Sequence, residues 1–125
     1  MIIGIGCDII KVERIQNAIT KNSLFCEKLF TPAEIEYCSR KANSAQSFAA
    51  RFAAKEAVMK ALGTGWDGKV NWLDIEIINS ATGSPSIKLT GGAQEVADKL
   101  KVKNICLSLA HEKDYALAYV ILEGE

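Results

Sequence analysis

The sequence predicts an α+β protein in which a small, mainly antiparallel sheet packs around one long central helix. Helical patterns cluster in the first half of the chain, and strand patterns separated by turns dominate the second half. The last two strand patterns are joined by so short a link that those strands must run antiparallel. The chain of 125 residues suits a single domain over residues 1–125 that needs no disulfides to build its core.

Composition argues against several classes of protein. Hydrophobic residues make up 49% of the chain and charged residues 24%, as in an ordinary globular domain. Because 15 basic side chains balance 15 acidic ones, we do not expect a general nucleic-acid binder. The apolar start, MIIGIGCDII, lacks a basic leader and is interrupted by Asp8, so we expect neither a signal peptide nor a membrane span.

The cysteines suggest a reducing compartment. The chain has one histidine and no CxxC pair, so no zinc constellation is visible. We expect reduced thiols, buried as small apolar side chains, in a cytoplasmic protein. The four positions are Cys7, Cys26, Cys38 and Cys106.

The first strand is expected over residues 1–10, which are rich in β-branched isoleucine, and should be buried on both faces. Gly4 and Gly6 interrupt it, and glycine inside a strand often marks the close approach of a ligand or another backbone. Asp8 lies near the end of this strand. It is either the N-cap of the next helix or a ligand for a cation, and the residues alone leave both interpretations open.

Three short helices are expected next. Apolar residues at helical spacing over residues 11–20 predict an amphipathic helix, on which Arg14 is either a solvated side chain or a contact for an acidic partner. A second helix is expected over residues 22–29. The segment 31–34 supplies a threonine N-cap, a proline at N1 and a glutamate at N3, which predict a third helix to about residue 41.

The longest helical pattern begins near Ser44 and runs for roughly five turns. At about 100° per residue, its large apolar side chains fall on one face and its alanines on the opposite face, where another backbone could approach closely. No ordinary solvent face is left, so this helix is expected to be central. The apolar face holds Phe48, Phe52, Met59 and Leu62, and the alanine face holds Ala50, Ala54, Ala57 and Ala61.

This enclosed helix nevertheless carries charges, which are costly to bury unless they are paired or bind something charged. Glu56 and Lys60 lie four residues apart, so they form either an ordinary helical ion pair or part of a site. The helix should stop at Gly63-Thr64-Gly65, which is either a C-cap or a bare backbone that can approach a ligand. The charged positions are Arg51, Lys55, Glu56 and Lys60.

The second half of the chain predicts hairpins and one more helix. His111 is expected in the closing turn, where it is either a structural side chain or a contact for a phosphate. Strands are expected over residues 70–79, 85–89, 104–110 and 115–122, with turns at 80–84 and 111–114 and a helix from about 90 to 101.

Asp8 and Glu56 together suggest a site for a hard cation, because Mg²⁺ prefers carboxylate oxygens and substrate phosphates. Lys60 and His111 could supply positive charge for phosphate oxygens, and the amides of Gly63, Thr64 and Gly65 could donate hydrogen bonds to them. These are the parts of a metal-assisted phosphoryl-type transfer, although the pattern does not identify a substrate.

Two segments carry a resemblance to a known family. Gly4 to Ile9, GIGCDI, and Phe52 to Gly65, FAAKEAVMKALGTG, are similar to the two signatures of 4′-phosphopantetheinyl transferases. Their spacing, the chain length and the S-x-x-H from Ser108 to His111 resemble the short bacterial type. The family often has a hydroxyl residue where this chain has Ala110, which bears on contacts near His111.

The resemblance implies the 4′-phosphopantetheinyl transferase fold and a reaction. Such an enzyme transfers the 4′-phosphopantetheine arm of coenzyme A to a serine of apo acyl carrier protein, releases adenosine 3′,5′-bisphosphate and supports fatty acid biosynthesis. Asp8 and Glu56 would hold Mg²⁺, and Lys60 would neutralise charge on the pyrophosphate. The implied contacts for coenzyme A phosphates are Arg51, Lys60, Gly63, Thr64, Gly65 and His111.

The same resemblance implies an assembly. Family members of this length are homotrimers with active sites between subunits, so neighbouring subunits could pack on the alanine face and the glycine-containing strand. The helix that carries Arg14 resembles the surface that receives the carrier protein. Two rivals stay open: a coenzyme A or nucleotide-binding module without catalysis, and an oligomerising protein in which Glu56 and Lys60 are only an ion pair.

Overall fold

The computed structural model of the chain describes residues 1–64 and 68–125. Its α+β architecture confirms the predicted fold class. The elements in order are β1 (Ile2–Lys11), α1 (Val12–Lys21), α2 (Phe25–Leu29), α3 (Pro32–Ser39), α4 (Ser44–Leu62), the 3₁₀ helix η1 (Trp72–Asp74), β2 (Ile75–Asn79), β3 (Pro85–Leu89), α5 (Gly91–Lys99), β4 (Val102–His111) and β5 (Tyr115–Gly124).

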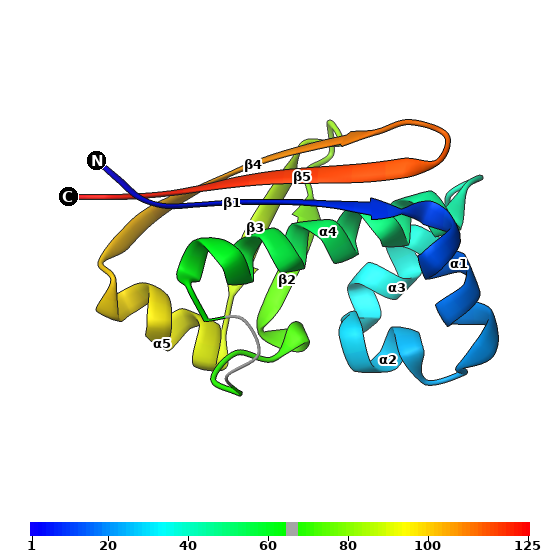
Figure 1. The fold of residues 1–125 in the computed structure, drawn as a ribbon, viewed down its shortest axis with the longest axis horizontal. Helices are drawn as coiled ribbons and strands as arrows, with labels where there is room; N and C mark the ends of the chain where they lie inside the picture. Colours follow the sequence, from blue (N-terminus) through cyan, green and yellow to red (C-terminus); the bar gives the residue numbers. More distant parts are fainter. Residues whose placement is uncertain (65–67) are drawn as a thin grey trace.

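Two antiparallel sheets form in the described residues. The larger has the strand order β1-β5-β4, and the smaller is the hairpin β2-β3. Figure 1 shows α4 running beneath the larger sheet, with α1 to α3 gathered at one end of the molecule and α5 at the other. The chain ends lie together, because the amino group of Met1 donates to the carbonyl of Gly124 at 2.9 Å.

The packing of β1 on α4 explains the two glycines in the first strand. A Cβ added to Gly6 would lie 2.0 Å from the carbonyl oxygen of Ala57, and one added to Gly4 would lie 2.3 Å from that of Ala61. Both approaches are closer than any side chain allows, so the strand needs glycine at both positions. The backbone that approaches the alanine face of α4 therefore belongs to β1 of the same chain.

The larger sheet has one covered and one open face. Directly opposite residues of antiparallel strands project from the same face, so Asp8, Ala118 and Leu109 share the side toward α4. On the other side, Ile5 and Ile9 are each 62% exposed. The prediction that β1 is buried on both faces is thus wrong for the isolated chain, because none of the described segments covers its outer face.

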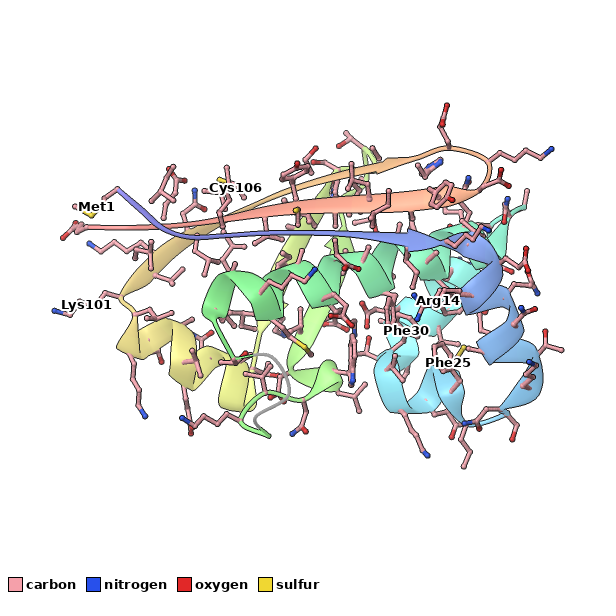
Figure 2. The ribbon with its side chains drawn as sticks, in the orientation of Figure 1. Met1, Arg14, Phe25, Phe30, Lys101 and Cys106 are labelled. Atoms are coloured by element: carbon pink, nitrogen blue, oxygen red, sulfur yellow. The ribbon has the colours of Figure 1, made fainter. Side chains whose placement is uncertain are left out.

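The open face defines an apolar surface, the outer sheet face. Cys7 and Cys106 lie on it and are exposed, contrary to the expectation of burial, whereas Cys38 is buried in the core and Cys26 is half-buried. Figure 2 shows Cys106 on the side of the sheet away from α4. Three rows make up the outer sheet face: Ile5–Ile121–Cys106, Cys7–Tyr119–Ser108 and Ile9–Leu117–Ala110.

A buried carboxylate ties α3 to α4 and β2. The predicted helix start at Thr31 is confirmed, because Thr31 and Glu34 form a capping box. The same Glu34 carboxylate accepts a hydrogen bond from Lys55 Nζ at 2.7 Å and another from the backbone N–H of Ile77 at 3.0 Å. Since Lys55 and Glu34 are both almost fully buried, removing Glu34 would leave the Lys55 ammonium without its carboxylate, at a cost of about 3–5 kcal/mol.

Several boundaries differ from the prediction. β1 continues to Lys11, which is the N-cap of α1 without a side-chain hydrogen bond, so Asp8 is not a helix cap. The strand expected over residues 70–79 begins only at Ile75. Its first part forms η1, where the backbone N–H of Asn71 donates to Asp74 Oδ2 at 3.1 Å and turns the chain.

Among the described helices, none is long and apolar enough to cross a lipid bilayer.

Gly6→Ala tests the contact between β1 and α4. We expect a loss of about 3 kcal/mol or more in the free energy of unfolding, because the new methyl meets a helix carbonyl that cannot move aside. Urea denaturation measures the loss, with Cys7→Ala at the exposed neighbouring position as the control. Equal stability of the Gly6→Ala variant and the wild type would contradict this account of the strand.

Candidate active site

Asp8 is placed beside α4 by the strand that the two glycines hold against the helix. Its side chain is 16% exposed, and Oδ1 lies 3.1 Å from the ammonium of Lys60. Lys60 Nζ also donates to the backbone carbonyl of Cys7 at 3.0 Å. The ion pair of Lys60 therefore joins α4 to β1. It is not the ion pair with Glu56 within the helix that one of the two interpretations of the sequence expected.

Glu56 lies one turn before Lys60 on the same side of α4 and is half-buried. Burial raises the pKa of its carboxyl group, the negative charge of Asp8 raises it further, and Lys60 and Arg14 oppose the rise. The charges of Asp8, Lys60 and Arg14 therefore all act on Glu56. We call this group, Asp8, Glu56, Lys60 and Arg14, the acidic-basic cluster.

Arg14 reaches the cluster from the first turn of α1. It is exposed, and Figure 2 shows it on the side of α1 that faces the middle of the molecule. The structure thus brings three elements, β1, α1 and α4, to one place. The cluster contains two acidic and two basic side chains, so it has no net charge when all four groups are ionised.

The cluster has the chemistry of a hard-cation site that is incomplete by itself. Carboxylate oxygens are what Mg²⁺ prefers, and the cluster contains two carboxylate side chains. Within the described part of the chain, no group of three or more histidine, cysteine, aspartate or glutamate side chains is arranged to hold a metal. Any ion bound between Asp8 and Glu56 would therefore need further ligands from water or from a phosphate-bearing molecule.

Arg51 and His111 do not join the cluster. They line a separate cavity of about 370 Å³, whose walls come from α3, α4, the β2–β3 turn and β4. Arg51 is nine residues before Lys60, which places the two about 180° apart around the helix axis. The body of α4 therefore separates the cavity from the acidic-basic cluster within one chain.

Arg51 is buried, with 4% of its surface exposed, and its contacts include residues that the sequence did not indicate as site residues. Its guanidinium lies 4.3 Å from the centre of the Tyr37 ring, and Nη2 donates to Asn79 Oδ1. Glu34 Oε2 lies 3.9 Å from Nε. The only signals in the sequence were the capping position of Glu34 and a polar residue, Asn79, at a strand end.

The C-terminus of α4 is a helix cap. Gly63 adopts a left-handed φ of 76° and its N–H donates to the carbonyl of Lys60 at 3.1 Å, while that of Thr64 donates to Met59 at 3.2 Å. Both amides are therefore already used, and neither is free to donate to a phosphate while the cap is intact. The Thr64 hydroxyl is buried without a hydrogen-bond partner. Gly65, the third residue of the expected phosphate contact, lies outside the described residues.

Comparisons with known proteins agree over the whole length. Residues 4–120 match the family model described as the 4′-phosphopantetheinyl transferase superfamily. The chain is 50% identical over 125 residues to the holo-[acyl-carrier-protein] synthase of Solibacter usitatus, covering 99% of this chain and 100% of that protein.

Solved structures show the same fold. The holo-[acyl-carrier-protein] synthase of Neisseria meningitidis superposes with a TM-score of 0.88 at 33% identity, over 98% of this chain and 99% of that one. The enzyme of the same name from Helicobacter pylori, solved in complex with coenzyme A, gives a TM-score of 0.84 at 32% identity, over 95% and 99%.

Glu56→Gln tests the electrostatics of the cluster. A carboxyl group whose folded pKa lies above its ordinary value of 4.5 costs stability once it is ionised. That cost is absent below about pH 4 and grows as the pH rises through the raised pKa. We therefore expect the variant to unfold at higher urea than the wild type near pH 7, and the two to converge in acid.

The control for this experiment is Glu95→Gln, which removes an exposed carboxylate from α5. It should leave the urea midpoint unchanged at both pH values. A Glu56→Gln variant that is less stable than the wild type near pH 7 would mean that Glu56 is held by favourable ion pairs.

Proposed function

We propose that this chain, which belongs to the 4′-phosphopantetheinyl transferase superfamily, is a holo-[acyl-carrier-protein] synthase. It transfers the 4′-phosphopantetheine group of coenzyme A to a serine of apo acyl carrier protein and releases adenosine 3′,5′-bisphosphate. The observation that carries the proposal is the ion pair of Asp8 and Lys60 at 3.1 Å between β1 and α4, with the carboxylate of Glu56 one helical turn before Lys60 and influenced by both charges. We assign the reaction to the cytoplasm and to fatty acid biosynthesis, as the family resemblance implies.

The cluster fits a magnesium ion. Two half-buried carboxylates whose negative charges disfavour each other gain most from a divalent cation placed between them, and their hard oxygens suit Mg²⁺. Asp8 and Glu56 would hold the ion, with water and the coenzyme A pyrophosphate as the other ligands. When bound, the ion supplies Lewis-acid stabilisation of charge on the phosphoryl oxygens.

The protein side chains then have separate tasks. The serine oxygen of the carrier protein attacks the phosphorus that bears the pantetheine, and the bond from that phosphorus to the bridging oxygen breaks. One of the two carboxylates, Asp8 or Glu56, would accept the serine proton. Lys60 neutralises the negative charge that collects on the departing adenosine 3′,5′-bisphosphate.

The cavity beside Arg51 and His111 is proposed for the nucleotide end of coenzyme A. Its walls include a buried guanidinium and an exposed histidine. Both side chains can donate hydrogen bonds to the 3′-phosphate of coenzyme A, which is separate from the pyrophosphate. The amides of Gly63 and Thr64 remain candidate contacts for a phosphate of coenzyme A, with less support than Arg51 and His111. Their amides are engaged in the helix cap, so contact with a phosphate would require the cap to rearrange.

The two halves of the site suggest assembly. Because α4 separates Arg51 and His111 from the acidic-basic cluster, we propose that the cluster of one copy faces the cavity of another. The outer sheet face supports this proposal, since Ile5, Ile9 and Tyr119 expose between 50% and 62% of their surface there. A homotrimer, as the family resemblance implies, would cover this face in each copy.

The carrier protein is proposed to dock on α1. Arg14 is exposed beside Glu56, so an acidic partner that paired with it would bring its serine to the carboxylates. Docking must place the carrier protein itself against the cluster, because the reacting serine belongs to the carrier protein.

Mass spectrometry of apo acyl carrier protein incubated with coenzyme A and Mg²⁺ tests the function. We expect the wild type to add one phosphopantetheine group, and Asp8→Asn to lower the rate by about 100-fold or more while the fold is kept. Removal of Mg²⁺ with a chelator should have a similar effect. Near-normal turnover by Asp8→Asn would remove the metal assignment, and coenzyme A binding without any transfer would favour the non-catalytic module.

Arg14→Glu serves as the comparison variant in that assay. It should raise the KM for the carrier protein by a larger factor than the KM for coenzyme A, because only the carrier protein is proposed to contact α1. Equal factors for the two substrates would argue against docking at Arg14.

Mixing of inactive variants tests the shared site. Asp8→Asn damages the cluster, and His111→Ala damages the cavity. If the two halves come from different copies, oligomers reassembled from equal amounts should regain about a quarter of the wild-type activity, by random pairing. A mixture of Asp8→Asn with Glu56→Gln, both in the cluster, should regain none, and failure of the first mixture would place a complete site in each chain.

A further inference from the structure

The contacts of Arg51 hold its guanidinium from several directions. Tyr37 packs against one face, and Nη2 donates both to Asn79 Oδ1 and to the backbone carbonyl of Ile77 at 3.4 Å. Nε is buried, and no hydrogen-bond acceptor reaches it. The orientation of this side chain therefore depends strongly on its one side-chain hydrogen bond, the bond to Asn79.

The two hydrogen bonds that Arg51 donates go to uncharged acceptors, Asn79 Oδ1 and the carbonyl of Ile77. Glu34 is the carboxylate nearest to its guanidinium, with Oε2 at 3.9 Å from Nε. The other oxygen of Glu34 accepts from Lys55 Nζ at 2.7 Å. Glu34 is thus shared between two cations, and Glu76, whose charge also acts on Lys55, lines a second cavity together with Arg51. The hydrogen bonds that orient the guanidinium are to neutral oxygens, and Arg51 forms no close ion pair with Glu34.

Asn79 also holds the opposite wall of the cavity. It is the last residue of β2, and its Nδ2 donates to the carbonyl of Gly83 at 3.0 Å across the β2–β3 turn. Gly83 adopts a left-handed φ of 89°, and both Gly83 and Pro85 line the cavity with Arg51. One amide therefore connects the turn to the guanidinium, and both of its polar ends are satisfied.

We propose that Asn79 is a positioning residue for coenzyme A, which holds Arg51 and the β2–β3 turn in the arrangement that receives the nucleotide end. The proposal rests on the proposed function, because it takes coenzyme A as the molecule in the cavity. A guanidinium already ordered in the free protein loses less entropy when an anion binds, so the ordering contributes directly to affinity. These contacts do not include a residue of the acidic-basic cluster, where the phosphoryl transfer is proposed to occur.

A double-mutant cycle separates positioning from a structural role. We expect Asn79→Ala to weaken coenzyme A binding roughly tenfold in calorimetry and to raise KM without lowering kcat, since an ordered charged hydrogen bond is lost. In an Arg51→Gln background the same change should cost less than about twofold, because Asn79 acts through the guanidinium. A loss of equal size in both backgrounds, or no loss in the wild type, would overturn the proposal.

Thr82→Ala is the matched control in the same turn. Its hydroxyl pairs only with the Ser80 hydroxyl and does not contact Asn79 or Arg51, so coenzyme A binding should be unchanged. If the melting temperature shows that Asn79→Ala does not fold, Asn79→Ser replaces it, since serine is too short to reach both partners. A tenfold loss with Thr82→Ala would mean that any change in this turn disturbs the cavity, and would overturn the specific role of Asn79.

A second readout does not depend on coenzyme A. The Nε–Hε signal of Arg51 in a nitrogen–proton NMR spectrum should be sharp and slow to exchange in the wild type and in Thr82→Ala, and broadened in Asn79→Ala. An unchanged signal in Asn79→Ala would overturn the positioning. If the wild type binds no coenzyme A, the proposed function fails, and this spectrum still decides whether Asn79 orders Arg51.

Discussion

The close packing of β1 against α4 is the contact on which the rest of the structure depends. Glycine at positions 4 and 6 lets the strand backbone reach the helix carbonyls of Ala61 and Ala57. Asp8, two residues farther along the same face of the strand, then lies within an ion-pair distance of Lys60 and close to Glu56. Side chains at the glycine positions would move the strand outward and separate the carboxylates from the ammonium, so fold and chemistry share one steric requirement.

The charges of α4 are divided between structure and site. Lys55 is buried against Glu34 and serves the core, Lys60 pairs with Asp8, and Arg51 lies on the opposite side of the helix from Lys60. This division explains how a largely enclosed helix can carry four charged residues. It also places Arg51 and Lys60 on different sides of the helix, which is the basis of the proposed assembly through the apolar outer sheet face.

Local patterns predicted the parts that depend on neighbours in sequence. The threonine, proline and glutamate at residues 31–34 form the expected capping box, and α4 ends at Gly63 as expected, with this glycine as a left-handed C-cap, one of the two interpretations of the segment. The prediction was wrong where partners are distant. The outer face of β1 is open, Cys7 and Cys106 are exposed, and residues 72–74 form a 3₁₀ turn because Asp74 bonds back to Asn71. None of these outcomes can be read from a hydrophobic pattern.

By itself, the sequence determined the α+β class, the enclosed helix with its charges, and the identity of the residues that carry a resemblance to one family. It could do so because helix caps, side-chain periodicity and signature spacing are properties of short segments. Only the tertiary structure decided that Lys60 pairs with Asp8, that Arg51 and His111 lie across α4 from them, and that Asn79 holds Arg51. Those facts depend on which faces of distant segments meet, and that is settled by packing the whole chain.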